Sequence, residues 1–332
     1  MKNSLKLVSF LFPVLLSQPS FACSSCGSSA TSPLVLKQNE NLKVYAGISE
    51  NYNYMNYGIA GGSSTKQWLD PEINTKQTMT LGLGYRTSEN SFVTVMGSVV
   101  RNEGLSNPED ATSGIKSSTM VGDPIISGRY NLLNMNFEEE YRPQIQLVAS
   151  YKPGLAKNMV DGDGDAIETT GNGFHQASGG VDVWFGMPFI QFGAAQFITY
   201  SFDRHPDTTF TYQNQKGTVS KRTRDLQYTT VLTVGHAFPD EKFSLSGGVV
   251  LDNIGKETST RTFANGDSDS VTAAASEHND LFVTLDWNAT KKDMVRFSYT
   301  YGGFYGGAFG PFTNSAQTTS NSVLVAYERT LY

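Results

Sequence analysis

The feature that most constrains this chain is a period-two alternation of apolar and polar residues that recurs along most of its length. In the window 42–49, for example, every second residue is apolar. Successive side chains of a β-strand point to opposite faces, so this period predicts strands that are apolar on one face only. Eleven further windows follow, at 78–85, 93–99, 126–132, 144–151, 181–185, 190–200, 226–234, 243–251, 281–287, 295–301 and 323–327.

The links between these windows alternate between long and short. Long links, rich in Gly, Asn, Ser, Thr and Asp, lie near 55–74, 102–117, 152–173, 203–222, 255–278 and 303–319. Short links lie at 88–90, 187–188, 239–242 and 290–293, and the link at 134–140 is intermediate. Long extracellular loops and short periplasmic turns are typical of transmembrane barrels. We therefore expect an all-β fold, a single antiparallel up-and-down transmembrane β-barrel of about 12 strands, spanning 41–332, with both termini periplasmic.

A soluble β-sandwich is the main alternative, because it also shows alternating strands and turn signals. The composition and the strand ends favour the barrel. Only 17% of the residues are charged, which is low for a soluble domain. The mean hydropathy is −0.30, and no window after residue 22 is apolar over the length that a membrane-spanning helix needs. Aromatic residues near the strand ends fit the two interfacial girdles of a membrane barrel; they are Tyr85, Tyr130, Tyr151, Trp184, Trp287, Tyr301 and Tyr327.

Residues 1–22 have the pattern of a secretory signal peptide. Lys2 and Lys6 precede an apolar core, and 20–22 is a small-x-small cleavage site. Removal of this segment, which holds two lysines and no acidic residue, takes the formal net charge from −6 to −8. We therefore expect a location in the outer membrane and exclude nucleic acid as a partner. The terminal aromatic Tyr332 indicates recognition by the β-barrel assembly machinery, and outer-membrane lipid is the second expected partner.

The segment 23–40 is Ser-rich, shows little strand pattern and begins with the pair Cys23 and Cys26. The oxidising periplasm favours a local disulfide. A redox-active pair and lipidation of Cys23 are alternatives that the sequence leaves open. Gly27 follows the pair where covalent haem attachment would need histidine. The segment itself is either a periplasmic tail or a plug that enters the barrel.

The strand face opposite the apolar one should line the lumen. By that rule five charged residues point inward, and they are Arg129, Asp182, Asp252, Asp286 and Arg296. Charges of both signs inside a small barrel have two interpretations. They pair with one another and hold the barrel closed, or they set the charge preference of a pore.

Two loops carry further candidate sites. Asp161, Asp163 and Asp165 place carboxylates at alternate positions, as in a calcium-binding loop, although Ala166 and Asn172 depart from the EF-hand pattern. This loop is either a Ca2+ site or a solvated acidic loop.

The Gly-rich loop 302–312 is either a plain surface loop or an apolar capture patch for a hydrophobic ligand. The patch would consist of Phe304, Tyr305, Phe309 and Phe312. Catalysis has little support, because the four histidines are scattered and there is no G-x-S-x-G motif. We therefore expect that the protein is not an enzyme.

Two stretches resemble a known family. The segment 122–130, GDPIISGRY, is similar to a strand opening in outer-membrane transporters of the MetA pathway of phenol degradation. The segments 151–154 (YKPG), 171–174 (GNGF) and 180–182 (GVD) resemble that family in order and spacing, although the usual Thr after Pro153 is missing. The resemblance implies a barrel in the style of fatty-acid and aromatic-hydrocarbon channels, some of which have an N-terminal plug.

These observations lead to two functional hypotheses. The first is a channel for passive passage of a small, apolar solute across the outer membrane, with the solute as its partner. The second is a scaffold or anchor whose N-terminal cysteine pair docks a periplasmic redox or assembly partner.

Overall fold

The fold is known from a computed structural model. It describes residues 34–37, 39–60, 63–68, 75–105, 114–134, 143–157, 166–168, 170–187, 190–206, 208–212, 215–238, 242–273, 275–302 and 317–332.

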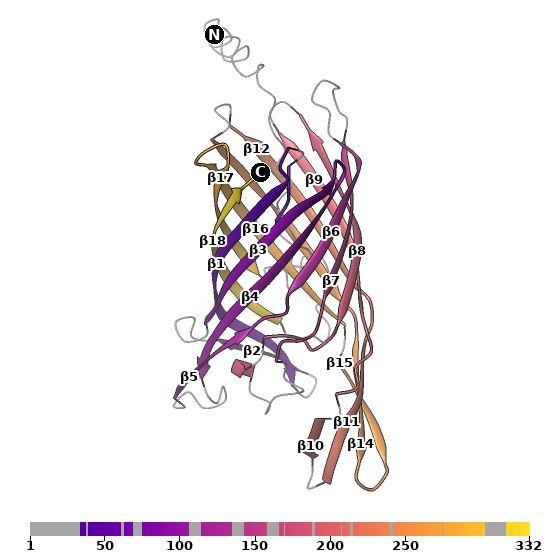
Figure 1. Ribbon diagram of the computed structural model, residues 1–332. Helices are drawn as coiled ribbons and strands as arrows, with labels where there is room; N and C mark the ends of the chain where they lie inside the picture. Colours follow the sequence, from indigo (N-terminus) through magenta and orange to yellow (C-terminus); the bar gives the residue numbers. More distant parts are fainter. Residues whose placement is uncertain are drawn as a thin grey trace, which may run out of the picture.

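Twelve antiparallel strands form a closed barrel (Figure 1). Each strand pairs with its neighbours along the chain, and the last strand pairs with the first from Lys43↔Thr330 to Tyr57↔Gln317. The predicted barrel and its strand number are therefore confirmed. In order around the wall the strands are β1 (Leu42–Ala60), β3 (Thr75–Ser88), β4 (Ser91–Leu105), β6 (Ile125–Leu133), β7 (Gln144–Lys152), β8 (Gln176–Gly186), β9 (Gln191–Ser201), β12 (Gln227–Ala237), β13 (Phe243–Ile254), β16 (Ser276–Asn288), β17 (Asp293–Gly302) and β18 (Gln317–Thr330).

The barrel has two distinct ends. At the terminal end, strand β1 begins beside the end of β18, and the short connections after β3, β8, β12 and β16 lie there as well. The loop end is opposite, and Figure 1 shows the C-terminus on the terminal side. These two names are used below.

Several of the long links contain strands of their own, which the sequence analysis did not predict. Two of them hold β2 (Ser63–Trp68) and β5 (Ile115–Val121), which continue the barrel sheet, and a third holds the short helix η1 (Ala166–Glu168). A separate four-stranded sheet extends beyond the loop end beside β8 and β9 (Figure 1). Its strands are rich in Thr, which favours β-structure, and they are β10 (Thr208–Tyr212), β11 (Gln215–Arg224), β14 (Glu257–Phe263) and β15 (Ser268–Ala273).

Apolar side chains cover the outside of the barrel. On β3, for example, Met79, Leu81 and Leu83 are exposed by 48–62%, whereas alternate residues face inward. Among the described residues, the middle of the outer face has one hydrogen-bonded polar pair, Gln196 and Thr230, with 2.6 Å between the Thr230 hydroxyl and the Gln196 amide oxygen. An apolar exterior on a closed sheet is how a β-structure satisfies its backbone within lipid.

The aromatic girdles differ from the prediction at one position. Tyr85, Tyr130 and Trp287 are exposed on the outer face as expected. Trp184, however, is only 3% exposed and faces inward. The prediction for Trp184 was wrong because its even position on β8 shares the inward parity of Asp182. No helix in the described part of the chain is long and apolar enough to cross a bilayer.

Candidate functional site in the barrel lumen

All five charged residues that the sequence placed on the inner face are buried, each with an exposure of 7% or less. Arg129 on β6 reaches Asp182 on β8, with 3.1 Å between guanidinium Nη1 and carboxylate Oδ2. Gln146 on the intervening strand β7 also accepts from Arg129 Nη1 at 3.2 Å, and its amide nitrogen donates to Asn131 at 2.6 Å. Asp252 accepts a hydrogen bond from the Thr229 hydroxyl. Arg129 and Asp182 therefore form one polar group on β6–β8, and Asp252 has a separate polar partner on β12.

A second group of charges lies at the terminal end and is called the seam cluster here. Its members are Glu40, Lys43, Asp286, Arg296 and Glu328. Arg296 binds both oxygens of Asp286, at 2.7 and 3.1 Å. Lys43 contacts both Glu40 and Glu328, at 3.0 and 3.1 Å. The sequence analysis missed Lys43 and Glu328, although both stand at inward positions of β1 and β18.

Part of the N-terminal segment lies inside the barrel. Leu34, Val35 and Leu36 are 0–4% exposed, and they pack against inward-facing side chains of β1 and β4. The Lys43 ammonium group donates to the Val35 carbonyl at 3.2 Å. Arg86 donates to the carbonyl groups of residues 37 and 40, the latter at 2.8 Å. Hydrogen bonds and apolar contacts therefore both hold residues 34–37 and Glu40 at the terminal end.

Two glycines on the inner face of β3 make room for this segment. A Cβ atom at Gly84 would collide with Leu36 Cδ1, and it would lie 3.3 Å from Leu34 Cδ2. A Cβ atom at Gly82 would lie 3.5 Å from Leu34 Cδ2 and 3.1 Å from Met96 Cγ. The inner wall is thus a groove at these positions. Leu34 and Leu36 fill it.

An apolar band crosses the middle of the lumen. Val148, Phe197, Val231 and Val250 come from strands β7, β9, β12 and β13, and they form one buried cluster. Phe282 on β16 packs against the same cluster. The inner wall is therefore apolar at this level, between polar groups nearer its two ends.

The aromatic rings of this wall lie against glycines. Phe197 lies so close to Gly180 on the neighbouring strand that a Cβ atom there would overlap its ring. Phe282 is placed in the same way over Gly248, where a Cβ atom would lie 2.8 Å from the ring. Each ring therefore packs against the backbone of a neighbouring strand, on the inner face of the barrel wall.

The segments that resemble the MetA-pathway family come together at the loop end. Asp123 accepts hydrogen bonds from the backbone N–H groups of Leu155 and Ala156, at 2.8 and 2.7 Å. A Cβ atom at Gly154 would lie 2.6 Å from the backbone of Phe174. Three stretches that are far apart in sequence, at 122–124, 152–156 and 171–174, therefore form one packed unit.

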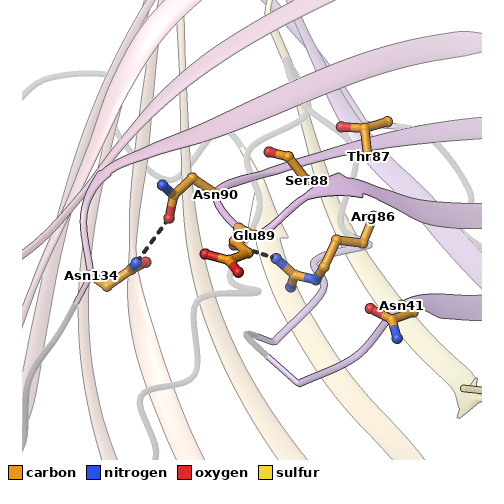
Figure 2. Close-up of a pocket in the computed structure, with 7 residues that line it drawn as sticks. All are labelled: Asn41, Arg86, Thr87, Ser88, Glu89, Asn90 and Asn134. Carbon is orange, nitrogen blue, oxygen red and sulfur yellow. Dashed lines mark hydrogen bonds between the residues drawn. The ribbon is translucent and has the colours of Figure 1, made fainter.

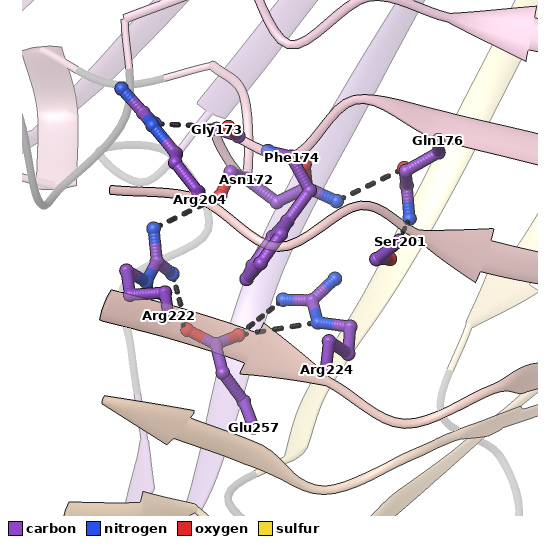
Figure 3. Close-up of polar contacts among 9 residues, drawn as sticks. All are labelled: Asn172, Gly173, Phe174, Gln176, Ser201, Arg204, Arg222, Arg224 and Glu257. Atoms are coloured by element: carbon purple, nitrogen blue, oxygen red, sulfur yellow. Dashed lines mark hydrogen bonds and ion pairs between the residues drawn. The ribbon is translucent and has the colours of Figure 1, made fainter. Parts of the chain in front are cut away.

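Phe174 is the centre of this unit and is fully buried. The guanidinium carbons of Arg222 and Arg224 lie 4.7 and 4.8 Å from its ring centroid. Both arginines also bind the carboxylate of Glu257, and Figure 3 shows the three side chains around the ring. Arg204 donates to the Gly173 carbonyl at 3.0 Å. Cation–π contacts and ion pairs thus fix the mouth of the barrel to the extension sheet.

A polar cavity of about 430 Å³ lies at the terminal end (Figure 2). Its wall includes Arg86, the turn Glu89–Asn90, and Asn134, whose amide donates to Asn90 at 3.1 Å. Since Arg86 also holds residues 37 and 40, this cavity borders the attachment of the N-terminal segment.

The remaining predicted site residues lie outside the described residues. They are Cys23, Cys26, Asp161, Asp163, Asp165, Phe304, Tyr305, Phe309 and Phe312. Within the part of the chain that is described, no group of three or more His, Cys, Asp or Glu residues could hold a metal ion. The disulfide, the Ca2+ site and the capture patch therefore stay predictions.

No protein-family model and no curated protein matches this chain. Among solved structures, the barrel resembles the COG4313 outer membrane channel from Pseudomonas putida F1, with a TM-score of 0.59, 12% identity and coverage of 87% of this chain and 95% of that one. It also matches the deltaS2 mutant of the TodX monoaromatic hydrocarbon channel, with a TM-score of 0.46, 9% identity and coverage of 88% and 91%. The NanC porin matches with a TM-score of 0.42, 9% identity and coverage of 87% and 100%. The match to the first of these structures concerns the fold alone, and the expected closed β-barrel is confirmed.

Proposed function

We propose that this protein is an outer-membrane channel through which a small solute with an apolar surface passes passively. In this proposal the terminal end faces the periplasm and the loop end faces the exterior. The observation that carries the proposal is the apolar band of Val148, Phe197, Val231 and Val250 in the middle of the lumen.

The N-terminal segment would act as a plug in this channel. Leu34 and Leu36 occupy the groove at Gly82 and Gly84, and the seam cluster holds the chain beside them. Because this part of the segment fills the groove and is held by non-covalent contacts alone, its release is the step that would widen the terminal end. The outer wall would be in contact with outer-membrane lipid.

Single-channel recording in planar bilayers tests the proposal. The full mature chain should conduct ions in KCl, and millimolar benzyl alcohol should produce transient blocks of the current, whereas glycerol should produce none. Val231→Ser, which changes the apolar band, should shorten the blocks about tenfold, the factor that corresponds to about 1.4 kcal/mol. Val234→Ser is the matched control, because Val234 lies on the same strand and faces outward.

Two results would count against the proposal. Equal blocking by benzyl alcohol in the wild type and in Val231→Ser would show that the apolar band does not contact the solute. A correctly folded barrel that carries no current and no flux would favour the alternative function, a scaffold that docks a periplasmic partner.

A further inference from the structure

The loop end of the lumen carries a concentration of positive charge, called the basic mouth here. It consists of Lys76, Lys152, Arg204, Arg222 and Arg224. Two carboxylates lie among these cations, those of Asp123 and Glu257. The five cations thus outnumber the two carboxylates that contact or act on them, whereas Asp252 on β13 and Asp280 on β16 lie at other inward positions towards the loop end.

The arginines of the basic mouth are held rigidly. Arg222 Nε lies 3.0 Å from one oxygen of Glu257, and Arg224 Nη2 lies 2.5 Å from the other. One carboxylate therefore serves two guanidinium groups and can neutralise one of them. Phe174 lies beneath both guanidinium groups and keeps them in place (Figure 3).

The lysines of the basic mouth face the lumen. Lys152 has the inward parity of Val148 on β7, and Lys76 has the inward parity of Gly82 on β3. Lys152 is within electrostatic range of Lys76 and Arg224, and Asp123 is the one acidic group that acts on it. Neither lysine forms an ion pair with another residue within the described ranges of the chain, and both stand at inward positions of their strands.

Asp123 is already engaged, because one of its oxygens accepts two backbone hydrogen bonds. Asp252, near the loop end of β13, is buried and accepts a hydrogen bond from Thr229. These two acidic groups are thus tied to the wall.

The apolar band lies directly below the basic mouth. Val148 precedes Lys152 by four residues on the same face of β7, which places it about 13 Å further along the strand at 3.3 Å per residue. A solute that enters from the loop end would meet ammonium groups first and an apolar wall next. That order suits a molecule with an anionic head and an apolar body.

We infer that the solute of this channel is an organic anion, a carboxylate or sulfonate on a small apolar body, and that Lys76 and Lys152 bind its charged head. This inference rests on the proposed channel function and specifies its substrate class. The charges of the basic mouth would raise the local concentration of such anions and speed their capture.

Permanently charged aromatic probes test this inference in the same planar bilayers. Benzenesulfonate should block the wild-type current at concentrations about tenfold lower than phenyltrimethylammonium, a cation of similar size. The double variant Lys76→Gln, Lys152→Gln should lose most of this preference, whereas Lys76→Arg, Lys152→Arg should retain it. The difference should disappear in 1 M KCl, where the screening length falls to about 3 Å.

Lys221→Gln is the matched control. Lys221 is paired with Asp203 at 2.8 Å on the extension sheet, so its loss should leave the preference unchanged. Block by both probes with equal potency, or an unchanged preference in the double Gln variant, would overturn the inference while the channel itself stands. Absence of any current in the wild type would overturn the channel function and this inference together.

Discussion

The substitution Gly84→Val should release the N-terminal segment from the barrel wall. A Cβ atom at this position collides with Leu36 Cδ1 and lies 3.3 Å from Leu34 Cδ2 and 3.4 Å from Thr94 Cγ2. Leu36 is 4% exposed and packs against Phe92, so it has no free space into which it could move. Removal of one leucine from such a site costs about 1.5–3 kcal/mol. The ratio of released to docked segment should therefore rise roughly 10- to 100-fold.

Limited trypsin digestion of the folded protein measures this release at Lys37. In the docked state the Lys37 N–H group donates to Glu40 Oε2 at 2.7 Å, and its carbonyl accepts from Arg86, so the adjacent peptide bond is held away from a protease. Cleavage after Lys37 should be faster in Gly84→Val by the same factor as the rise in the ratio of released to docked segment. Mass spectrometry of the N-terminal fragment measures the rate of cleavage.

Gly97→Val is the matched control, because Gly97 lies on the outward face of β4 with no atom within 4 Å of the added Cβ. This variant introduces the same Gly→Val substitution into the same barrel sheet, away from the N-terminal segment. If Gly84→Val were cleaved at the wild-type rate while both variants kept the heat-resistant mobility of a folded barrel, the docking argument would be wrong.

Two further predictions concern charged groups. Asp286→Asn should leave Arg296, which is 4% exposed, without its bidentate partner. We expect the free energy of unfolding to fall by about 3–5 kcal/mol, as measured by urea titration of the barrel in micelles. An unchanged midpoint of unfolding would contradict this prediction. Outside the barrel wall, hydrogen bonds and charge from Lys116 and Lys157 lower the pKa of Glu168 from 4.5 to about 2. Because the pKa of Glu168 is lower in the folded state than in the unfolded state, this contact contributes its full stabilisation of the folded state above about pH 4.5. The contribution is lost as the pH falls through about 2. Carboxyl NMR should detect the low pKa, and Lys116→Gln should raise it; a value that did not move would rule out this ion pair.

The sequence predicted the barrel well because the period of two is imposed by the environment on both faces of the wall. Outward positions contact lipid and inward positions do not, so the parity that places Arg129 and Asp182 inside follows from residue type alone. Trp184 shows the limit of residue type, since tryptophan suits either an interfacial girdle or an inner wall. Its place was decided by its position in the strand, and by Gly193 opposite, where a Cβ atom would lie 2.8 Å from the indole ring.

Other parts of the site depend on contacts between distant segments, which no local pattern encodes. The extension sheet forms because β11 leads into β12 and β14 follows β13, the neighbour of β12, so that β11 can pair with β14. The groove for Leu34 and Leu36 did leave a signal, namely two glycines at inward positions of β3. An apolar triplet next to a strand with a glycine-lined inner face is a pattern that could indicate docking in other barrels.

The contacts at residues 40–43 have a consequence for how the molecule is made. The Thr330 hydroxyl donates to Glu40 at 2.8 Å, and the Leu331 N–H group donates to the Leu42 carbonyl, also at 2.8 Å. These bonds join positions that are 290 residues apart or nearly so, and loop-closure entropy makes such pairings late events in folding. These two bonds can therefore form only when β1 meets β18, so the attachment of residues 40–42 to the C-terminal strand is completed when the barrel closes.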